Sequence, residues 1–330
     1  MKLADRISRL GTETAFAVSA EAAAFAAEGN KVYPFHLGDI NIKTPVNVME
    51  ASVKAMQDGK TGYCPNAGCS DLRAVLAEDV SASRAVSYSM ENVAIQPGGK
   101  PTIGKFILAM MNPGDEVLYP NPGYPIYESM IEFHGGKAVP YTYKEGAENF
   151  EIDLEMLERQ ITPRTRILVL NDLQNPTGAE CSPAEMERLA EVVLKHDLYV
   201  LSDEAYFDIR YEGKSRSIVS LPGMAERCVI LYTFSKKFAM TGWRLGAPFL
   251  VQGHGVAFGT QGHLYGISQG IYAFFQGVPE ILSEYNLFSH LLSSSFYLII
   301  YFGRLASTSL SRRIIYSTSS TLISVPPYLA

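Results

Sequence analysis

Short apolar segments alternate with longer amphipathic segments along residues 54–250, and this alternation limits the possible fold more than any other feature of the chain. Five of the short segments have the length and composition of buried strands and are followed by turn residues. These segments are residues 93–95, 116–119, 167–170, 198–201 and 228–231. Strands that alternate with helices form a mostly parallel sheet with helices on both faces. The sequence therefore predicts an α/β fold in three layers, α/β/α.

Two of the predicted helices can be placed from their ends. Residues 184–195 have helical periodicity, with Ser182 as N-cap, Pro183 as the first helical residue and Glu185 as the partner in a capping box. The Ala-rich residues 12–27 stop before Gly29, and glycine commonly terminates helices.

The chain changes character after residue 250. Residues 251–330 hold only five of the chain's 62 charged side chains and are rich in serine. The uncharged residues 285–303 approach the length of a bilayer span, but they include Asn286, His290 and four serines, so a membrane span is not expected. We interpret residues 251–330 as a disordered or poorly folded tail, or as sequence read from another frame or exon.

Composition excludes several classes of function. The net charge is −6 and no basic block occurs, so no nucleic-acid partner is expected. The four cysteines have neither metal-ligand nor disulfide-scaffold spacing, and no His-x-x-x-His pair occurs, so no metal site is expected. Reduced thiols and an N-terminus without a secretory pattern favour a cytoplasmic protein.

Residues 235–244 read Ser-Lys-Lys-Phe-Ala-Met-Thr-Gly-Trp-Arg and follow the predicted strand at 228–231. A lysine near a strand end can hold an aldehyde cofactor as a Schiff base, and an arginine eight residues later can bind the cofactor's phosphate. Lys236 stands directly after the serine and has this spacing to Arg244, so we interpret Lys237 as a solvated neighbour. The combination predicts pyridoxal 5'-phosphate (PLP) as the cofactor.

The other groups that PLP chemistry needs follow other predicted strands, where open α/β sheets bind their ligands. We expect Asp203 at the pyridine nitrogen, and Tyr206 and Asn175 at the phenolate oxygen. Tyr124 is expected to stack on the ring. The expected phosphate ligands are Gly98, Gly99, Lys100, Thr233, Ser235 and Arg244. Lys236, Asp203 and Tyr206 are the expected catalytic residues.

Taken singly these signals are weak. An aspartate after a strand is more often a helix cap or turn residue, and Gly-Gly is more often a simple turn. Tyr124 alone would more often belong to the core. The order of these residues and their placement at strand ends carry the prediction.

The chain resembles the class I/II aminotransferases of PLP fold type I, and especially their bacterial and archaeal aspartate aminotransferase-like branch. The resemblance covers about residues 1–250. Its matched segments are Gly38-Asp39 with Thr44-Pro45, and residues 61–72, 97–100, 112–116, 121–127, 175–178, 203–206 and 235–246.

The resemblance implies properties that the residues alone do not. Members of this family are homodimers with active sites at the subunit interface, and Tyr63 matches the tyrosine that reaches the neighbouring subunit's cofactor phosphate. Gly38 matches a backbone contact near the substrate carboxylate. Lys100 matches a lysine that pairs with the substrate's distal carboxylate, although a surface lysine at a helix start is the alternative interpretation. Asn175 also borders the substrate.

The resemblance further divides the chain into residues 1–45 as part of a small domain, 46–250 as the large PLP-binding domain, and 251–330 as an atypical tail. The family's C-terminal part completes the small domain and supplies an arginine for the substrate α-carboxylate. No segment here matches it, and Arg313 is the nearest candidate. The small domain is therefore expected to be incomplete or atypical.

The expected function is amino-group transfer between an L-amino acid, with aspartate or glutamate favoured, and a 2-oxo acid. Prephenate or alanine-type substrates stay open. Two alternatives remain at the level of sequence. One is a PLP lyase or decarboxylase of the same fold, because the cofactor motifs do not choose the bond that breaks. The other is a truncated or frameshifted, non-catalytic PLP-binding homologue.

Overall fold

The computed structural model describes residues 3–250, apart from residues 12–13, 36, 41 and 147–148. Its α-helices are α1 (Thr14–Ala27), α2 (Val46–Gln57), α3 (Ser70–Arg84), α4 (Lys100–Met110), α5 (Ile126–Phe133), α6 (Leu154–Arg159), α7 (Pro183–Lys195) and α8 (Phe234–Lys237). Its strands are β1 (Glu116–Pro120), β2 (Lys137–Tyr141), β3 (Tyr143–Glu145), β4 (Phe150–Ile152), β5 (Thr165–Asn171), β6 (Tyr199–Asp203), β7 (Cys228–Thr233) and β8 (Gly246–Phe249). Short 3-10 helices lie at Asp5–Arg9, Met90–Asn92 and Ile218–Ser220.

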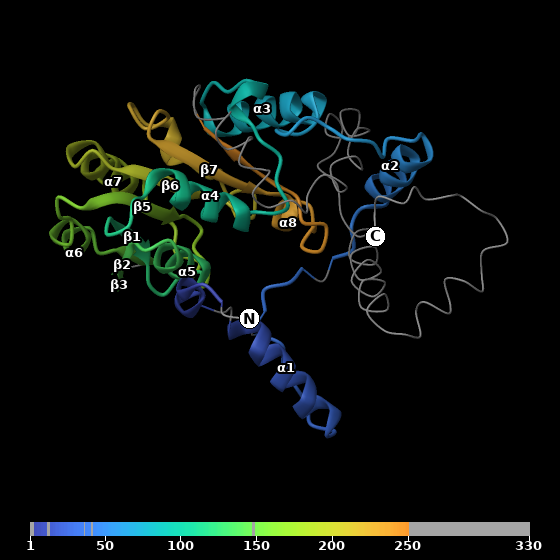
Figure 1. The fold of residues 1–330 in the computed structure, drawn as a ribbon, viewed down its shortest axis with the longest axis horizontal. Coiled ribbons are helices and arrows are strands. Elements are labelled where there is room, and N and C mark those ends of the chain that lie inside the picture. The colour runs from blue at the N-terminus through green and yellow to red at the C-terminus, as the bar shows by residue number, and fades with distance from the viewer. Residues whose placement is uncertain (1–2, 12–13, 36, 41, 147–148, 251–330) are drawn as a thin grey trace.

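One six-stranded sheet crosses the molecule in the order β2-β1-β5-β6-β7-β8 (Figure 1). All neighbouring strands in it are parallel except β7 and β8, which are antiparallel. Strands β3 and β4 form a separate antiparallel pair. The predicted mostly parallel sheet is confirmed.

Helices cover both faces of this sheet, as the three-layer prediction requires. Successive residues of β5 enter opposite hydrophobic clusters, with Leu168 and Leu170 in one, and Ile167 and Val169 in the other. The first cluster includes apolar residues of α3, α6 and α7, and the second includes apolar residues of α4 and α5. Because alternate side chains of a strand point to opposite faces, the near-continuous apolar sequence of β5 is what a doubly covered strand needs.

Four of the five predicted strands are present, as parts of β1, β5, β6 and β7. The prediction of a strand at residues 93–95 was wrong. This segment makes only isolated bridges, from Val93 to Phe249 and from Gln96 to Gly246. Between them the amide of Ala94 reaches the carbonyl of Pro248 only at 3.5 Å, and Pro248 has no N–H to donate in return, so the ladder with β8 is incomplete.

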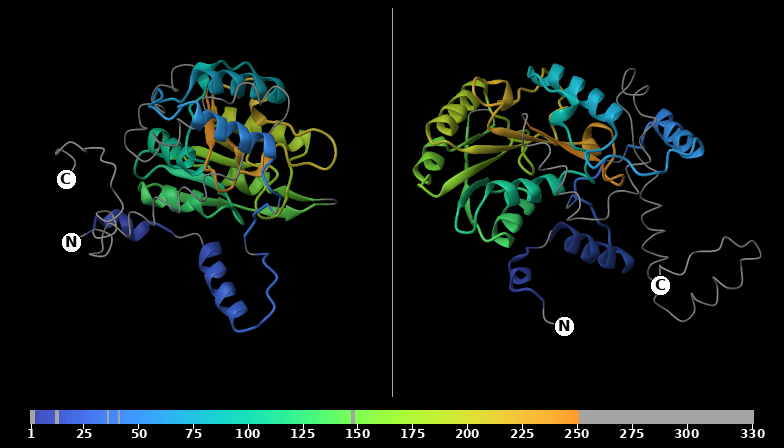
Figure 2. Two further views of the ribbon diagram at one scale, coloured as in Figure 1. Left: turned by 90° about the vertical axis from the view of Figure 1, so that its right-hand side faces the viewer. Right: turned by 45° about the horizontal axis from the view of Figure 1, so that its top comes forward.

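Both helix ends predicted from the sequence are confirmed. Helix α7 begins with a complete capping box, in which Glu185 N donates to Ser182 Oγ at 3.2 Å and Ser182 N donates to Glu185 Oε2 at 2.8 Å. Helix α1 ends two residues before Gly29, which has a φ of +90°. Both views of Figure 2 place α1 away from the three-layer body, and Val18 and Phe25 on it are 43% and 52% exposed.

None of the helices among the described residues combines the length and apolar character that crossing a bilayer requires. The predictions for residues 251–330, including the uncharged segment at 285–303 and Arg313, lie outside the described residues.

Candidate active site

The carboxyl ends of β5, β6 and β7 bring several of the predicted residues to one edge of the sheet. Asn171 and Asp203 end β5 and β6 and are direct register partners, and Asp203 also pairs with Leu231 of β7. Lys236 lies one turn beyond the end of β7, in α8. Parallel strands place their carboxyl ends at the same edge of the sheet. Residues that follow different strands in the sequence therefore lie close together in space.

Asp203 is a buried carboxyl group with unusual surroundings. Its Oδ2 accepts a hydrogen bond of 2.5 Å from the hydroxyl of Tyr127, and its Oδ1 accepts one of 3.1 Å from the amide of Ala205. Burial raises the pKa of Asp203 to about 6, although both hydrogen bonds act to lower it. Among the described residues no lysine or arginine forms an ion pair with Asp203. The carboxylate therefore lacks the cation that buried charges usually have.

Asn171 forms hydrogen bonds to two predicted site residues, Asp203 and Asn175. Its Nδ2 donates to the backbone carbonyl of Asp203 at 3.1 Å, and its Oδ1 accepts from the amide of Asn175 at 3.0 Å. Neither Asn171 nor Tyr127 is among the site residues predicted from the sequence. A polar residue closing an apolar strand was the available signal for Asn171, but Tyr127 had none beyond its place in the matched residues 121–127.

Lys236 and Gly38, far apart in the sequence, are in contact. The Nζ of Lys236 donates to the carbonyl of Gly38 and lies 5.7 Å from the ring centroid of Tyr206. Desolvation lowers the pKa of Lys236, Asp39 acts to raise it, and Arg244 acts to lower it. A lysine with a lowered pKa spends more time as the neutral amine, which is the nucleophilic and basic form.

The interpretation of Lys237 as a solvated neighbour was wrong. Its side chain is 8% exposed and forms ion pairs with Asp79 at 3.0 Å and Asp208 at 3.4 Å. Consecutive residues of a helix point about 100° apart, so Lys237 turns toward α3 while Lys236 turns toward Gly38.

Glycines and hydroxyls form a cradle between the start of α4 and the end of β7. A Cβ on Gly98, which has a φ of +85°, would overlap the guanidinium of Arg244, and one on Gly246 would overlap the backbone of Gly98. The hydroxyls of Thr233 and Ser235 are 2.9 Å apart and buried. Helix α4 begins at Lys100, so the amides after Gly98 have the orientation that binds anions.

The remaining predicted residues lie at the border of this group or outside it. Tyr124 is half-buried and packs edge to face on Tyr127, with 5.7 Å between ring centroids. Asn175 is half-buried and Lys100 is exposed. Tyr63 is 87% exposed and makes none of the contacts described above.

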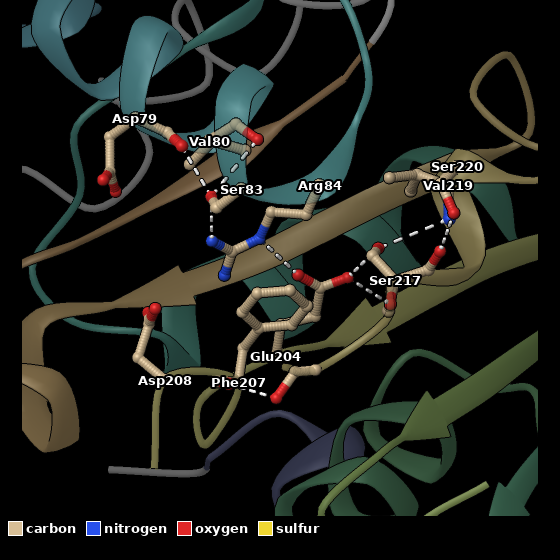
Figure 3. A network of polar contacts seen from close by, with 12 residues as sticks. Asp79, Val80, Ser83, Arg84, Glu204, Phe207, Asp208, Ser217, Val219 and Ser220 are labelled. Carbon is tan, nitrogen blue, oxygen red and sulfur yellow. Dashed lines mark hydrogen bonds and ion pairs between the residues drawn. The ribbon is translucent and has the colours of Figure 1, made fainter. Parts of the chain in front are cut away.

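A buried ion pair involves Glu204, the residue that follows Asp203 in the sequence (Figure 3). Arg84 Nε, at the end of α3, is 2.9 Å from Glu204 Oε2, and the two side chains are 0% and 3% exposed. The other carboxylate oxygen of Glu204 accepts from Ser202 and Ser217, and the guanidinium of Arg84 stacks 3.6 Å from the centroid of the Phe207 ring. This network anchors the turn that carries Asp203 and Tyr206.

Comparison with known proteins identifies the family. The family model described as aminotransferase class I and II matches residues 31–293. The chain belongs to the class I and II aminotransferases. It is 36% identical over 248 residues to an aspartate aminotransferase of Musicola paradisiaca, and 36% identical over 247 residues to an aspartate/prephenate aminotransferase of Thermus thermophilus. Each alignment covers 74% of this chain.

Solved aminotransferase structures have the same fold. The structure of the Thermus thermophilus aspartate aminotransferase with maleate superposes with a TM-score of 0.80 at 30% identity, covering 92% of this chain and 78% of that one. An aspartate aminotransferase from Rhizobium meliloti superposes with a TM-score of 0.78 at 27% identity, covering 92% and 75%. The sheet and its helices are those of PLP fold type I, as predicted.

The alignments cover only part of each curated relative. The alignments cover 61% of the Musicola paradisiaca protein and 63% of the Thermus thermophilus protein, so the chain spans about three fifths of the curated relatives it matches.

Aminotransferases of the aspartate aminotransferase type use PLP. The described residues fit this cofactor at both of its polar ends. A buried carboxylate without a cationic partner suits a protonated pyridine nitrogen, since each would satisfy the other. The cradle at Gly98, where a side chain would collide with Arg244, suits a phosphate held by amides and a guanidinium.

Proposed function

We propose that the chain transfers an amino group between an L-amino acid and a 2-oxo acid, with PLP as cofactor. The observation that carries this proposal is the position of Lys236, whose Nζ lies 5.7 Å from the ring centroid of Tyr206 and whose pKa is lowered by desolvation and by the charge of Arg244. Tyr206 in turn faces Asp203, and the guanidinium of Arg244 lies against Gly98. Bound PLP would supply an aldehyde that condenses with amines and a ring that accepts electrons.

Lys236 has the central role in this proposal. Its Nζ would hold the cofactor covalently. Once the substrate amine displaces it, the same Nζ would take the proton from the substrate Cα and deliver it to the cofactor carbon on the other side of the linking nitrogen. The desolvation that lowers its pKa favours the neutral amine needed for the first of these proton transfers. The carbonyl of Gly38 would orient Nζ between the two positions.

The other predicted residues bind and orient. Asp203 would keep the ring nitrogen protonated, and Tyr206 and Asn175 would donate to the phenolate oxygen. Tyr124 would cover a ring face. Gly98, Gly99, Lys100, Thr233, Ser235 and Arg244 would bind the phosphate.

We further propose aspartate or glutamate as amino donor. Two relatives are named for aspartate, and the Thermus thermophilus structure was solved with the dicarboxylate maleate. Lys100, exposed at the start of α4, is the candidate partner for the distal carboxylate. The backbone of Gly38 is the candidate contact near the α-carboxylate. Another relative, from Pseudomonas aeruginosa, is named as an arginine–pyruvate transaminase, so the named substrates differ among the relatives.

The active form is proposed to be a cytoplasmic homodimer. The exposure of Tyr63 and of Val18 and Phe25 on α1 supports this, because apolar and aromatic side chains that face solvent in one subunit are suited to an interface.

An absorption spectrum tests the function. The purified chain with PLP is expected to have a band near the edge of the visible range that shifts on addition of aspartate, and 2-oxoglutarate is expected to reverse the shift. Lys236→Ala should lose the lysine-dependent band and all turnover, whereas Lys237→Ala should retain the band. Transamination by the Lys236→Ala variant, or a wild-type spectrum that no amino acid changes, would contradict the proposal.

A further inference from the structure

The hydroxyl of Tyr127 occupies a position that the proposed roles leave unexplained. Tyr127 is in the first turn of α5, and its side chain is fully buried between α5 and the sheet. Its hydroxyl donates to Asp203 Oδ2 at 2.5 Å, across 76 positions of sequence. Burial and the charge of Asp203 raise the pKa of Tyr127 well above its usual value, so the phenol keeps its proton and remains a donor.

This hydrogen bond opposes the other influences on Asp203. Burial favours the neutral acid, and the carboxylate of Glu204 on the same strand end does the same. Tyr206 also faces Asp203, but the hydrogen bonds that favour the ionised carboxylate come from Tyr127 and the amide of Ala205. A hydrogen bond to one oxygen of a carboxylate also fixes the plane of the carboxylate group. The direction in which the other oxygen points is then fixed as well.

We propose that Tyr127 is a positioning residue that holds Asp203 ionised and correctly turned toward the ring nitrogen of PLP. This proposal rests on the proposed function, because it assigns Tyr127 to the same cofactor site. It acts through Asp203 and predicts no contact between Tyr127 and the cofactor.

The test compares two cofactors that differ only at the ring nitrogen. Dissociation constants for PLP and for 1-deaza-PLP, in which carbon replaces that nitrogen, are measured by absorbance for the full-length wild type and for Tyr127→Phe. Wild type is expected to prefer PLP. In Tyr127→Phe the affinity for PLP should fall about tenfold, the loss expected for a hydrogen bond to a charged group, while the affinity for the analogue is unchanged. A variant with merely looser packing would lose affinity for both.

Tyr141→Phe is the matched control. Tyr141 is equally buried, and its hydroxyl donates to the backbone carbonyl of Val169 at 2.9 Å instead of to a carboxylate. This variant should bind the two cofactors with the wild-type ratio. Site-specific replacement of Tyr127 by 3-fluorotyrosine, which keeps the ring shape and makes the phenol a stronger donor, should preserve or raise the preference for PLP, and it serves if Tyr127→Phe does not fold.

The outcomes separate this proposal from the one on which it rests. A wild-type chain that binds neither cofactor would overturn the proposed function and this role with it. A wild type that prefers PLP, beside a Tyr127→Phe variant with the same preference, would overturn the role of Tyr127 alone. A fall in preference confined to Tyr127→Phe would support it.

Discussion

Two aspartates at strand ends, the buried Asp203 and the half-buried Asp172, illustrate how the position of a residue sets its acidity. Asp203 and Asp172 follow or end neighbouring strands, and burial raises the pKa of each to about 6. Asp203 has the hydroxyl of Tyr127 and the edge of the proposed cofactor site as neighbours. Asp172 accepts a hydrogen bond of 2.8 Å from the amide of Cys181, and the charge of Glu180 adds to the effect of burial. Asp172 has no role in the proposed chemistry. The effect of its raised pKa is therefore expected only in the free energy of unfolding.

Asp172→Asn is expected to make stability less dependent on pH. The folded chain binds the proton of Asp172 more tightly than the unfolded chain, where the pKa is 3.8. The resulting stabilisation is fully present below pH 3.8 and is lost as pH rises through about 6. Between pH 3.5 and pH 7 the free energy of unfolding of the variant should rise by on the order of 2–3 kcal/mol relative to that of the wild type. Urea unfolding of both proteins at several pH values measures this, and a difference that stays constant with pH would refute the assignment.

At the scale of elements, α3 is tied to the end of β6 by one charged contact. The side chains of Arg84 and Glu204 are 0% and 3% exposed, and Glu204 accepts hydrogen bonds from Ser217 (Figure 3) and from Ser202. Pairs of this kind contribute little net stability as a whole, but loss of one member leaves an uncompensated charge in the interior. The turn from Asp203 to Tyr206 begins at this pair, so a disturbance there reaches the candidate active site.

Arg84→Met should therefore lower the free energy of unfolding by about 3–5 kcal/mol. The double variant Arg84→Met/Glu204→Gln removes both charges and keeps an oxygen that accepts from Ser202 and Ser217, so it should recover much of this loss. Chemical unfolding of the three proteins measures the difference. Equal instability of the single and double variants would show that packing of the Arg84 side chain on Phe207, and not charge, is what matters.

At the scale of the whole molecule, the proposed homodimer would explain two features that have no role within one subunit, the exposed Tyr63 and the projecting helix α1. Tyr63 is exposed, and α1 extends from the body (Figure 2). If Tyr63 completes the phosphate site of a second subunit, each site is built from two chains.

Mixed dimers test this arrangement. Lys236→Ala and Tyr63→Ala chains should each bind PLP poorly as homodimers, for different reasons. Co-expressed with separate affinity tags, they should form hybrids in which the subunit with intact Lys236 receives Tyr63 from its neighbour. The hybrid is then expected to bind one PLP tightly per dimer, about half the wild-type stoichiometry, as two-fold symmetry requires. Hybrids no better than the parent homodimers would place Tyr63 outside the partner's site.

The sequence alone determined the layers of the fold and the edge of the sheet at which the candidate site is proposed. Apolar runs such as residues 167–170 are local patterns, and so is the capping box of α7, because strand and helix periodicity and cap hydrogen bonds involve residues close together in the chain. Parallel pairing then puts residues after different strands at one edge, so the predictions for Asp203 and Lys236 needed no knowledge of contacts.

Only the tertiary structure decided which side chains meet. The contacts from Tyr127 to Asp203, from Arg84 to Glu204 and from Lys236 to Gly38 join residues 76, 120 and 198 positions apart. It also turned Lys237 inward to α3 and left residues 93–95 without a strand ladder. No local spacing encodes such contacts, because they depend on how complete elements pack and on which buried polar groups must find partners.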